Sequence, residues 1–209
     1  MSIAPAAASF AALAAFVALG RVSTRRRLPA IDRWVYQRAR DAYDRRVELL
    51  QRPLEIIGLP GAYIPLGFLI ARQMRRARVA GGSTVWSAAL AGWLALRATR
   101  LVYYRKRPPR PPHRGPKTES SYPSGHTTGI TALAVAAAVV LERAGALSPA
   151  AARALGIGAP LLIGLNRAYV REHWVTDVLG GWLLGAAVAL GSVSLRDRRP
   201  RLALPGRRG

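Results

Sequence analysis

Long runs without a charged residue alternate with clusters of arginine along this chain, and this segregation constrains the fold more than any other feature. The uncharged runs are residues 1–20, 56–71, 79–96, 127–141, 154–166 and 178–195. With a few flanking residues, most of them reach the roughly 20 residues that a helix needs to cross about 30 Å of hydrocarbon. The runs are rich in Ala, Leu, Val and Gly, and small residues allow membrane helices to approach one another closely.

Buried core helices of a soluble protein are the alternative explanation of these runs. Six of them in 209 residues, with arginine clusters between, would leave no amphipathic helices to cover the core. The sequence therefore predicts an all-α integral membrane protein of one domain over residues 1–209. We expect a six-helix bundle with spans near 3–20, 55–72, 81–103, 125–142, 149–166 and 177–195, and a basic tail over 196–209.

Two features of the spans need comment. The first run lacks the positively charged start and the small-residue cleavage site of a signal peptide, so we expect a retained helix. Pro60, Pro65 and Pro160 fall inside or at the ends of the second and fifth runs. Packed membrane helices tolerate such residues as kinks.

The segment between the first two spans, roughly 21–54, carries ten Arg residues interleaved with apolar and aromatic positions such as Trp34, Tyr43 and Leu50. This pattern is typical of a helix that lies in the lipid headgroup region. We therefore expect an interfacial amphipathic segment over 28–52; a solvated charged loop is the alternative.

Composition excludes several classes of protein. The net charge is +22, yet 51% of the residues are apolar, which argues against a solvated nucleic-acid-binding chain. The absence of Cys excludes disulfide scaffolds, thiolate zinc sites and thiol nucleophiles. Three His and ten carboxylates, mostly scattered, are little material for a metal centre. We expect no metal, no cofactor and no nucleic-acid partner, and the oligomeric state is not indicated.

The first polar cluster ends the third span. Arg100 and Arg107 are separated by seven residues, almost two helical turns, so a helix that continued to Pro108 would place both on one face. Arginines that merely anchor the end of a membrane helix are the alternative.

The second cluster opens the fourth span with Ser124, Gly125 and His126. Ser124 is suited to cap the helix, and Gly125 permits close approach of a ligand to the backbone. The free amides of a helix N-terminus form an anion site, and His126 belongs to that first turn. Simple helix capping is the alternative.

The third cluster lies between the fifth and sixth spans and contains Arg167, His173 and Asp177. Because His173 and Asp177 are four residues apart, a helix would let the carboxylate accept from one imidazole nitrogen and leave the other as nucleophile or base. An ordinary surface pair is the alternative.

An up-and-down bundle brings these three clusters to the same face of the membrane, whichever way the chain is inserted. The combined set offers arginine side chains, helix-terminal amides, a hydroxyl and two histidines. Guanidinium groups and helix amides match the tetrahedral, multiply charged phosphate group. The sequence therefore indicates a phosphate site at one end of the bundle.

The clusters together resemble the three-part signature of the type 2 phosphatidic acid phosphatases, whose superfamily also contains vanadium haloperoxidases: Arg100-x6-Arg107-Pro108, Pro123-Ser124-Gly125-His126 and Arg167-x5-His173-x3-Asp177. Two positions depart from the usual pattern. Arg100 stands where Lys is usual, and Asn166 where Ser is usual, which puts a contact from that hydroxyl in doubt.

The resemblance implies metal-independent hydrolysis of a lipid phosphate in the bilayer. By this resemblance, His173 attacks phosphorus, Asp177 orients it, and His126 protonates the leaving oxygen. The phosphoryl oxygens would be held by Arg100, Arg107, Ser124, Gly125 and Arg167.

Two other functions remain open on the residues alone. A non-catalytic basic membrane protein could bind anionic lipids or partners through 21–54 and 196–208, but it would not need the histidines. A haloperoxidase shares the signature, but membrane spans and a lipid-facing site argue against it.

The lipid and the orientation are less constrained. Undecaprenyl diphosphate, phosphatidic acid and phosphatidylglycerol phosphate all fit a cationic site, and we expect a bacterial inner-membrane protein. A positive-inside count favours a cytoplasmic site, but several of the counted arginines would bind phosphate. Since similar bacterial phosphatases place the site outside, we expect an extracytoplasmic site.

Overall fold

The computed structural model describes residues 4–25 and 28–198, and every regular element in these ranges is helical. The long helices are α1 (Ala4–Ser23), α5 (Pro60–Arg76), α6 (Gly82–Val102), α7 (Gly125–Arg143), α10 (Val175–Asp197), and a continuous helix made of α8 (Pro149–Arg153), a π-helical turn at Ala154–Gly158 and α9 (Ala159–Tyr169). The short ones are α2 (Ala30–Asp41), α3 (Arg45–Leu50) and α4 (Arg52–Ile57). A 3-10 turn occupies Pro112–Arg114.

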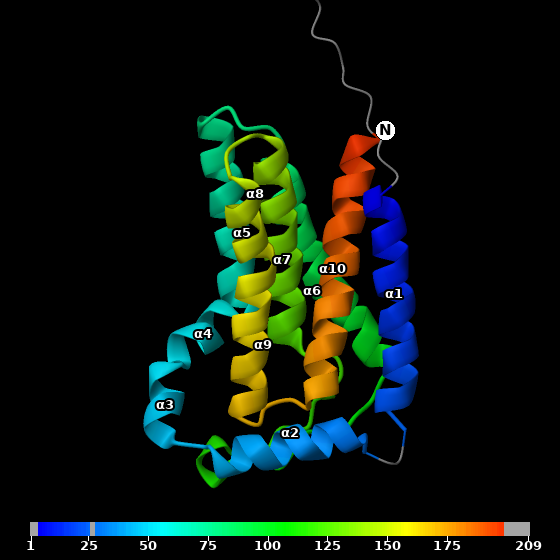
Figure 1. The fold of residues 1–209 in the computed structure, drawn as a ribbon, viewed down its shortest axis with the longest axis vertical. Coiled ribbons are helices and arrows are strands. Elements are labelled where there is room, and N and C mark those ends of the chain that lie inside the picture. The colour runs from blue at the N-terminus through cyan, green and yellow to red at the C-terminus, as the bar shows by residue number, and fades with distance from the viewer. Residues whose placement is uncertain (1–3, 26–27, 199–209) are drawn as a thin grey trace, which may run out of the picture.

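The long helices run side by side as a bundle, with α7 contacting α5, α6, α9 and α10, and α1 packed against α10 (Figure 1). α6 and α9 end, and α7 and α10 begin, at the same end of the bundle (Figure 1). α2 crosses beneath that end and contacts α9 and α10. The arrangement brings the three polar clusters of the sequence to one end, as the alternation of spans predicts.

α7 and α10 pack against each other extensively, and small residues make a close approach possible. A Cβ atom on Gly185 would lie 2.6 Å from the carbonyl oxygen of Thr128, and one on Gly181 would lie 2.9 Å from that of Ser124. The two backbones are therefore in direct contact, the packing by which helices associate in a bilayer.

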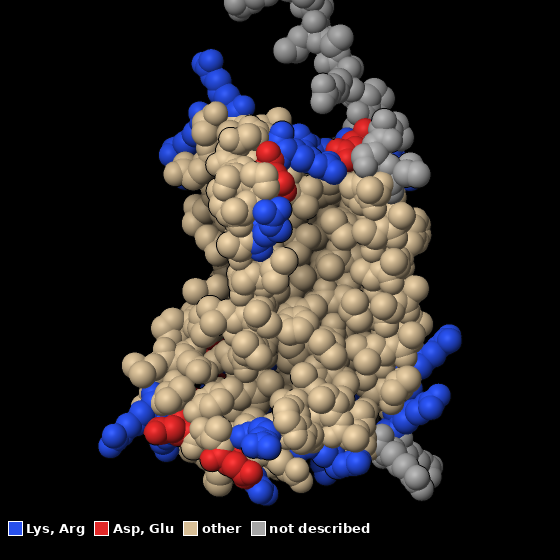
Figure 2. Space-filling model, viewed as in Figure 1, with Lys and Arg blue, Asp and Glu red and all other residues tan. Residues whose placement is uncertain are grey.

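On the face shown in Figure 2, a band without charged side chains separates two charged rims. Leucines of several helices are exposed, among them Leu94, Leu161 and Leu195. α1, α7 and α10 are each long and apolar enough to cross a membrane. α5 has 17 residues, and α6 carries Arg97 and Arg100 near its end. The count of six spans therefore stays a prediction for the remaining helices.

The second and fifth spans differ from their predicted limits. The second was expected at 55–72, but α4 ends at Ile57 and α5 begins only at Pro60, which fits the first turn of a helix. The fifth span begins as expected at Pro149 and continues to Tyr169 rather than 166. Pro160 produces no break, because the π-helical turn before it accommodates its ring and its missing N–H.

The predicted interfacial segment 28–52 contains α2 and α3, with Ile31 and Trp34 of α2 exposed. On the opposite side of α2, Asp32 and Ala39 are buried against the bundle. The helical character is thus confirmed, and its position at a headgroup layer stays a prediction. Of the predicted basic tail 196–209, residues 199–209 lie outside the described residues.

Candidate active site

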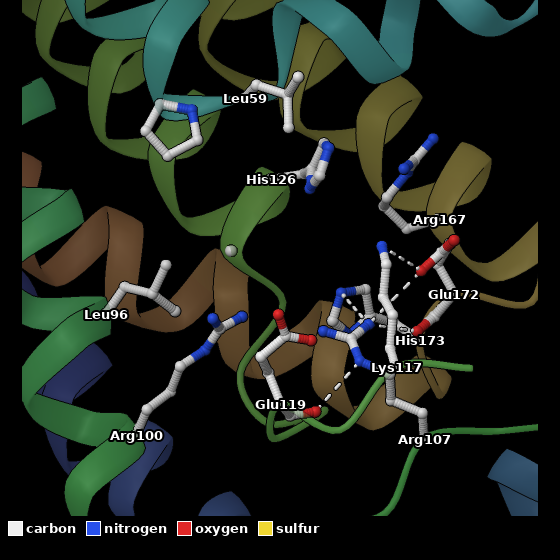
Figure 3. A pocket seen from close by; sticks show the side chains of 12 residues that line it. Leu59, Leu96, Arg100, Arg107, Lys117, Glu119, His126, Arg167, Glu172 and His173 are labelled. Carbon is white, nitrogen blue, oxygen red and sulfur yellow. Dashed lines mark hydrogen bonds and ion pairs between the residues drawn. The ribbon is translucent and has the colours of Figure 1, made fainter. Parts of the chain in front are cut away.

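A cavity of about 190 Å³ lies at the end of the bundle where α7 begins (Figure 3). Leu59, Pro60 and Leu96 form its apolar wall. Six of the eight predicted site residues line it: Arg100, Arg107, Gly125, His126, Arg167 and His173. Lys117, Glu119 and Glu172 complete the charged lining. The structure therefore brings residues from all three clusters into one small space.

The ring of His173 is held in a single orientation. Its Nδ1 lies 2.8 Å from the carbonyl oxygen of Ser121, which can only accept, so Nδ1 carries the proton. The other nitrogen, Nε2, then carries no proton and has a free electron pair. It lies 3.2 Å from Nη1 of Arg107. Burial, only partly offset by Asp177, lowers the pKa of His173 to about 4. The ring is thus neutral near pH 7 and presents a nucleophilic nitrogen to the pocket.

Asp177 does not orient His173 in the way the sequence suggested. His173 precedes α10 rather than lying on it, and the Oδ2 atom of Asp177 is 3.7 Å from Nδ1. Instead, Oδ2 accepts from Ser121 Oγ at 2.5 Å and from the backbone N–H of Trp174 at 2.8 Å. The direct partner of the ring is the Ser121 carbonyl, and Asp177 fixes the Ser121 side chain and the start of α10.

The start of α7 supplies His126 and Gly125. The Nε2 atom of His126 is buried and has no hydrogen-bond partner in the described part of the chain. A Cβ on Gly125 would lie 2.9 Å from Leu96 Cδ2 and 3.5 Å from Arg100 Nη2. His126 is therefore unpartnered at the pocket wall, and glycine keeps the backbone close to Arg100.

Ser124 occupies the N-cap position of α7, but its hydroxyl does not cap the helix. The side chain is fully buried, and its Oγ accepts from Thr127 Oγ1 at 2.9 Å. Ser124 does not line the cavity. In this structure the Ser124 hydroxyl therefore does not point into the cavity where phosphate would bind.

The predicted helix from Arg100 to Arg107 is wrong: α6 ends at Val102 and Tyr103 is extended. The backbone pairs with a later segment instead, since Arg105 O accepts from Ser121 N at 2.8 Å and Arg105 N donates to Ser120 Oγ at 3.2 Å. We call residues 103–121 the strap. It carries Arg107 to the pocket from one side, while Arg100 reaches it from the last turn of α6.

The three pocket arginines differ in how they are held. Arg107 donates to the backbone carbonyls of Glu172 and Glu119, at 2.8 and 3.2 Å. Arg167 donates to Glu55 at 3.1 Å and to Asn166 at 2.9 Å. By contrast, the buried Nε of Arg100 has no partner among the described residues. Asn166, which stands where the family signature has Ser, thus helps to position Arg167.

Sequence reasoning missed Glu172, whose carboxylate holds the strap. Arg110, Arg114 and Lys117 bind it at 2.5, 2.8 and 3.0 Å, and Arg107 approaches to 3.6 Å. Although burial alone would raise its pKa, the surrounding cations hold the pKa of Glu172 well below its usual range. The density of basic residues over 105–117, followed by one Glu directly before His173, was the available signal.

The strap is also tied to the helices beneath it. Arg114 bridges Glu48 of α3 and Glu55 of α4 at 2.7 and 3.0 Å. His113, which had no assigned role, lies 3.0 Å from Glu48. Against the opposing effect of burial, hydrogen bonds and charge from Arg114 and Arg167 lower the pKa of Glu55 to about 2.

Metal ligands are not grouped in the part of the chain that the structure describes: no three His, Asp or Glu side chains there come close enough to hold an ion. What the pocket offers is cationic and amide donors for an anion beside a neutral imidazole nitrogen.

Comparisons with known proteins bear on the fold and the family of this chain. A solved structure, the transmembrane PAP2-type phosphatidylglycerolphosphate phosphatase from Bacillus subtilis, superposes with a TM-score of 0.79 at 19% identity, covering 93% of this chain and 98% of that one. The likeness shows a shared all-helical transmembrane fold. This chain is an integral membrane protein.

A curated relative, the undecaprenyl-diphosphatase of Sulfolobus acidocaldarius, is 36% identical over 83 residues, or 40% of this chain. The match spans only 37% of the relative's length. Residues 78–201 match the family model of the PAP2 superfamily, and these residues include all three polar clusters. The chain belongs to the PAP2 superfamily.

Proposed function

We propose that this protein is a membrane lipid phosphatase that hydrolyses a lipid phosphomonoester or diphosphate through a phosphohistidine on His173. One observation carries the proposal: the unprotonated Nε2 of a neutral, buried imidazole faces a cationic pocket, while its Nδ1 is fixed by the Ser121 carbonyl. Such a nitrogen is a nucleophile already aimed at the place where an anion would bind.

The first chemical step joins Nε2 of His173 to phosphorus and breaks the bond from phosphorus to the leaving oxygen. His126, at the opposite wall of the pocket (Figure 3), delivers a proton to that oxygen. In the second step water attacks phosphorus, His126 takes up its proton, and the bond to Nε2 breaks. The products are inorganic phosphate and the lipid with one phosphoryl group fewer, an alcohol from a phosphomonoester or a lipid monophosphate from a diphosphate.

The pocket arginines stabilise the charge of the transferring group. Arg100 has an unpartnered Nε, so it can bind a phosphoryl oxygen without giving up an existing contact of that atom. Arg107 and Arg167, with the amides of Gly125 and His126 at the N-terminus of α7, complete the cradle. Positioning and charge stabilisation are the main demands of phosphoryl transfer.

The substrate is proposed as a lipid because the pocket is small and has one apolar wall. A cavity of about 190 Å³ admits a headgroup, and Leu59, Pro60 and Leu96 give its lining an apolar part that suits a lipid chain. Undecaprenyl diphosphate, phosphatidylglycerol phosphate and phosphatidic acid are the candidates. The printed activities of the two similar proteins favour the first two for the initial test.

The mechanism is tested with His173→Ala and His126→Ala in detergent with EDTA present. His173→Ala should lose turnover of every substrate. His126→Ala should lose about 10²–10⁴-fold on phosphatidic acid, whose leaving group needs a proton, and less on an aryl phosphate or a diphosphate. Trapped phosphate should map to His173. Mapping to His126, or near-normal activity of His173→Ala, would refute the assignment. Binding of anionic lipid without release of phosphate by the wild type would favour the non-catalytic alternative.

We further propose one domain in a bacterial inner membrane with the pocket on the extracytoplasmic side. The chain has no Cys, so single cysteines report orientation cleanly. Thr118→Cys lies exposed on the strap, and Ala146→Cys lies exposed at the opposite end of the bundle. In intact cells an impermeant maleimide should label the first and spare the second until lysis. The reverse pattern would place the pocket inside.

A further inference from the structure

A buried chain of charges connects the helix beneath the bundle to the histidine loop. Asp32 of α2 is only 1% exposed and accepts from Arg105 Nη2 at 2.6 Å. Its two oxygens also accept from the backbone N–H and the hydroxyl of Thr176, at 2.9 and 2.8 Å. Both oxygens of this buried carboxylate are thus hydrogen-bonded.

Arg105 is the middle of this chain. Its Nη1 donates to Asp177 Oδ1 at 2.5 Å and to Thr176 Oγ1 at 2.7 Å, and only 7% of the residue is exposed. The guanidinium also lies over the ring of Trp174, 5.7 Å from its centroid. One buried cation therefore bridges two buried carboxylates, one of which lies behind His173.

The charge of this trio matters for the proposed reaction. When Nε2 of a ring that is already protonated at Nδ1 bonds to phosphorus, the ring becomes a positively charged phosphoimidazolium. With Arg105 alone beside it, the negative charge of Asp177 would be neutralised. With Asp32 present, two carboxylates face one guanidinium, and the trio keeps one net negative charge.

We propose that Asp32 is a positioning residue for catalysis: it offsets the charge of Arg105, so that Asp177 keeps its negative charge available to His173. This inference rests on the proposed function. It assigns a chemical role to α2, which would otherwise be only a surface helix attached to the bundle.

A purely structural role would make different demands. A helix anchor needs hydrogen bonds, and these are lost one by one as partners are removed. A charge offset depends on the net charge of Asp32, Arg105 and Asp177, and removing a second, opposite charge restores that net charge. Removing Asp32 and Arg105 together loses more contacts than removing either, yet it returns the net charge to that of Asp177 alone.

The experiment compares Asp32→Asn, Arg105→Gln and the double variant in kcat, KM and pH profile. Asp32→Asn should lower kcat about tenfold, the equivalent of one pKa unit, with little change in KM. Arg105→Gln should move the acid limb of the pH profile to higher pH, because a trio with two negative charges favours protonated His173. The double variant should recover kcat to within about threefold of the wild type and return the limb to its original place.

The matched control is Asp41→Asn, on the same helix but in an exposed pair with Arg40. It should leave kcat unchanged. Other charged groups that face His173 are unchanged in all variants; they are Arg107, Lys117 and Glu119 of the strap, Glu172, Arg100, His126 and Arg167.

Three results would overturn the proposal: wild-type kcat in Asp32→Asn, a double variant as impaired as the worse single variant, or limb shifts in the same direction for both. Thermal unfolding in detergent checks folding. If a single variant fails to fold, the double variant decides: near-normal kcat supports the charge offset, and its loss contradicts it.

A second readout is independent of turnover. The ¹⁵N resonances of His173 are identified by their loss in His173→Asn. They should titrate at higher pH in Arg105→Gln than in the wild type, and in the double variant the midpoint should return to the wild-type pH. If the wild type released no phosphate from any lipid, the proposed function would fail. The titration would still show whether the charges of Asp32 and Arg105 reach the ring, so the two failures are distinguishable.

Discussion

The α7–α10 seam and the strap lie next to each other and are held together by opposite means. The seam has backbone against backbone, with Gly181 and Gly185 facing the first turns of α7. The strap packs its first residue, Tyr103, against Phe16 and Tyr122, and its later part is held by ion pairs that converge on Glu172. In lipid, close contact of small residues stabilises helix pairs, whereas a strap outside the hydrocarbon can use charge.

The difference explains where the reactive groups are found. His126 begins the helix of the seam, so its position is set by rigid packing. His173 and Arg107 belong to the ion-pair region, where Arg107 donates to the Glu172 carbonyl and lies 3.2 Å from the His173 ring. The stability of the charged region should therefore fall when a single charge is removed or when acid is added. The stability of the seam should fall when the volume of a side chain is increased.

The largest expected effect is that of Glu172→Gln. Removing one partner of a buried ion pair costs about 3–5 kcal/mol, because the remaining charges stay buried without compensation. We expect a comparable loss in the free energy of unfolding in detergent, together with loss of phosphatase activity, because the strap that carries Arg107 loses the carboxylate that binds Arg110, Arg114 and Lys117. Glu142→Gln, on an exposed residue at the end of α7, is the matched control. Equal stability of the two variants would contradict the role of Glu172.

Acid should destabilise the strap before the seam. The pKa values of Glu172 and Glu48 are lowered in the fold, and that of Glu55 falls to about 2. A carboxylate with a lowered pKa contributes stability that is complete above its unfolded value of about 4.3 and is lost as the pH falls below it. The melting temperature should therefore drop between about pH 4.5 and pH 2. The drop should be smaller in Glu172→Gln; an identical pH dependence would show that Glu172 is not the group that titrates.

Gly185→Ala tests the seam by volume. Its Cβ would lie 2.6 Å from a backbone oxygen of α7, so the helices must move apart. Overpacking of this kind costs about 1–3 kcal/mol. Gly158→Ala is the control, because a Cβ there meets nothing within 4 Å. A thermal shift that did not distinguish the two variants would show that the seam is looser than the structure indicates.

The smallest expected effect concerns the ion pair at the other end of the bundle. Arg143 and Asp197 lie 2.8 Å apart, but their side chains are 38% and 31% exposed. Such a pair contributes at most about 1 kcal/mol. Asp197→Asn should therefore leave the unfolding free energy and the activity nearly unchanged. A loss as large as that of Glu172→Gln would show that the exposed ion pair contributes as much stability as the buried ones.

The amino-acid pattern alone predicted the helical bundle and the convergence of the three clusters, because both follow from local properties. The length of an uncharged run measures whether a helix can cross a bilayer, and alternating spans place their ends on alternate faces. Six of the eight predicted site residues line one cavity for that reason. Their chemical roles stay predictions until the histidine variants are measured.

Partner choice among the charged residues was decided only by the tertiary structure. With 32 basic and 10 acidic residues, sequence spacing does not say which cation each carboxylate takes. The pairing of Asp32 with Arg105 joins residues 73 positions apart, and the end of α6 at Val102 follows from backbone pairing between Arg105 and Ser121. The spacing of His173 and Asp177 suggested a helical pair, yet the ring donates to a carbonyl of the strap. Apolar runs act through their own length, whereas a buried charge takes whichever opposite charge the fold brings to it.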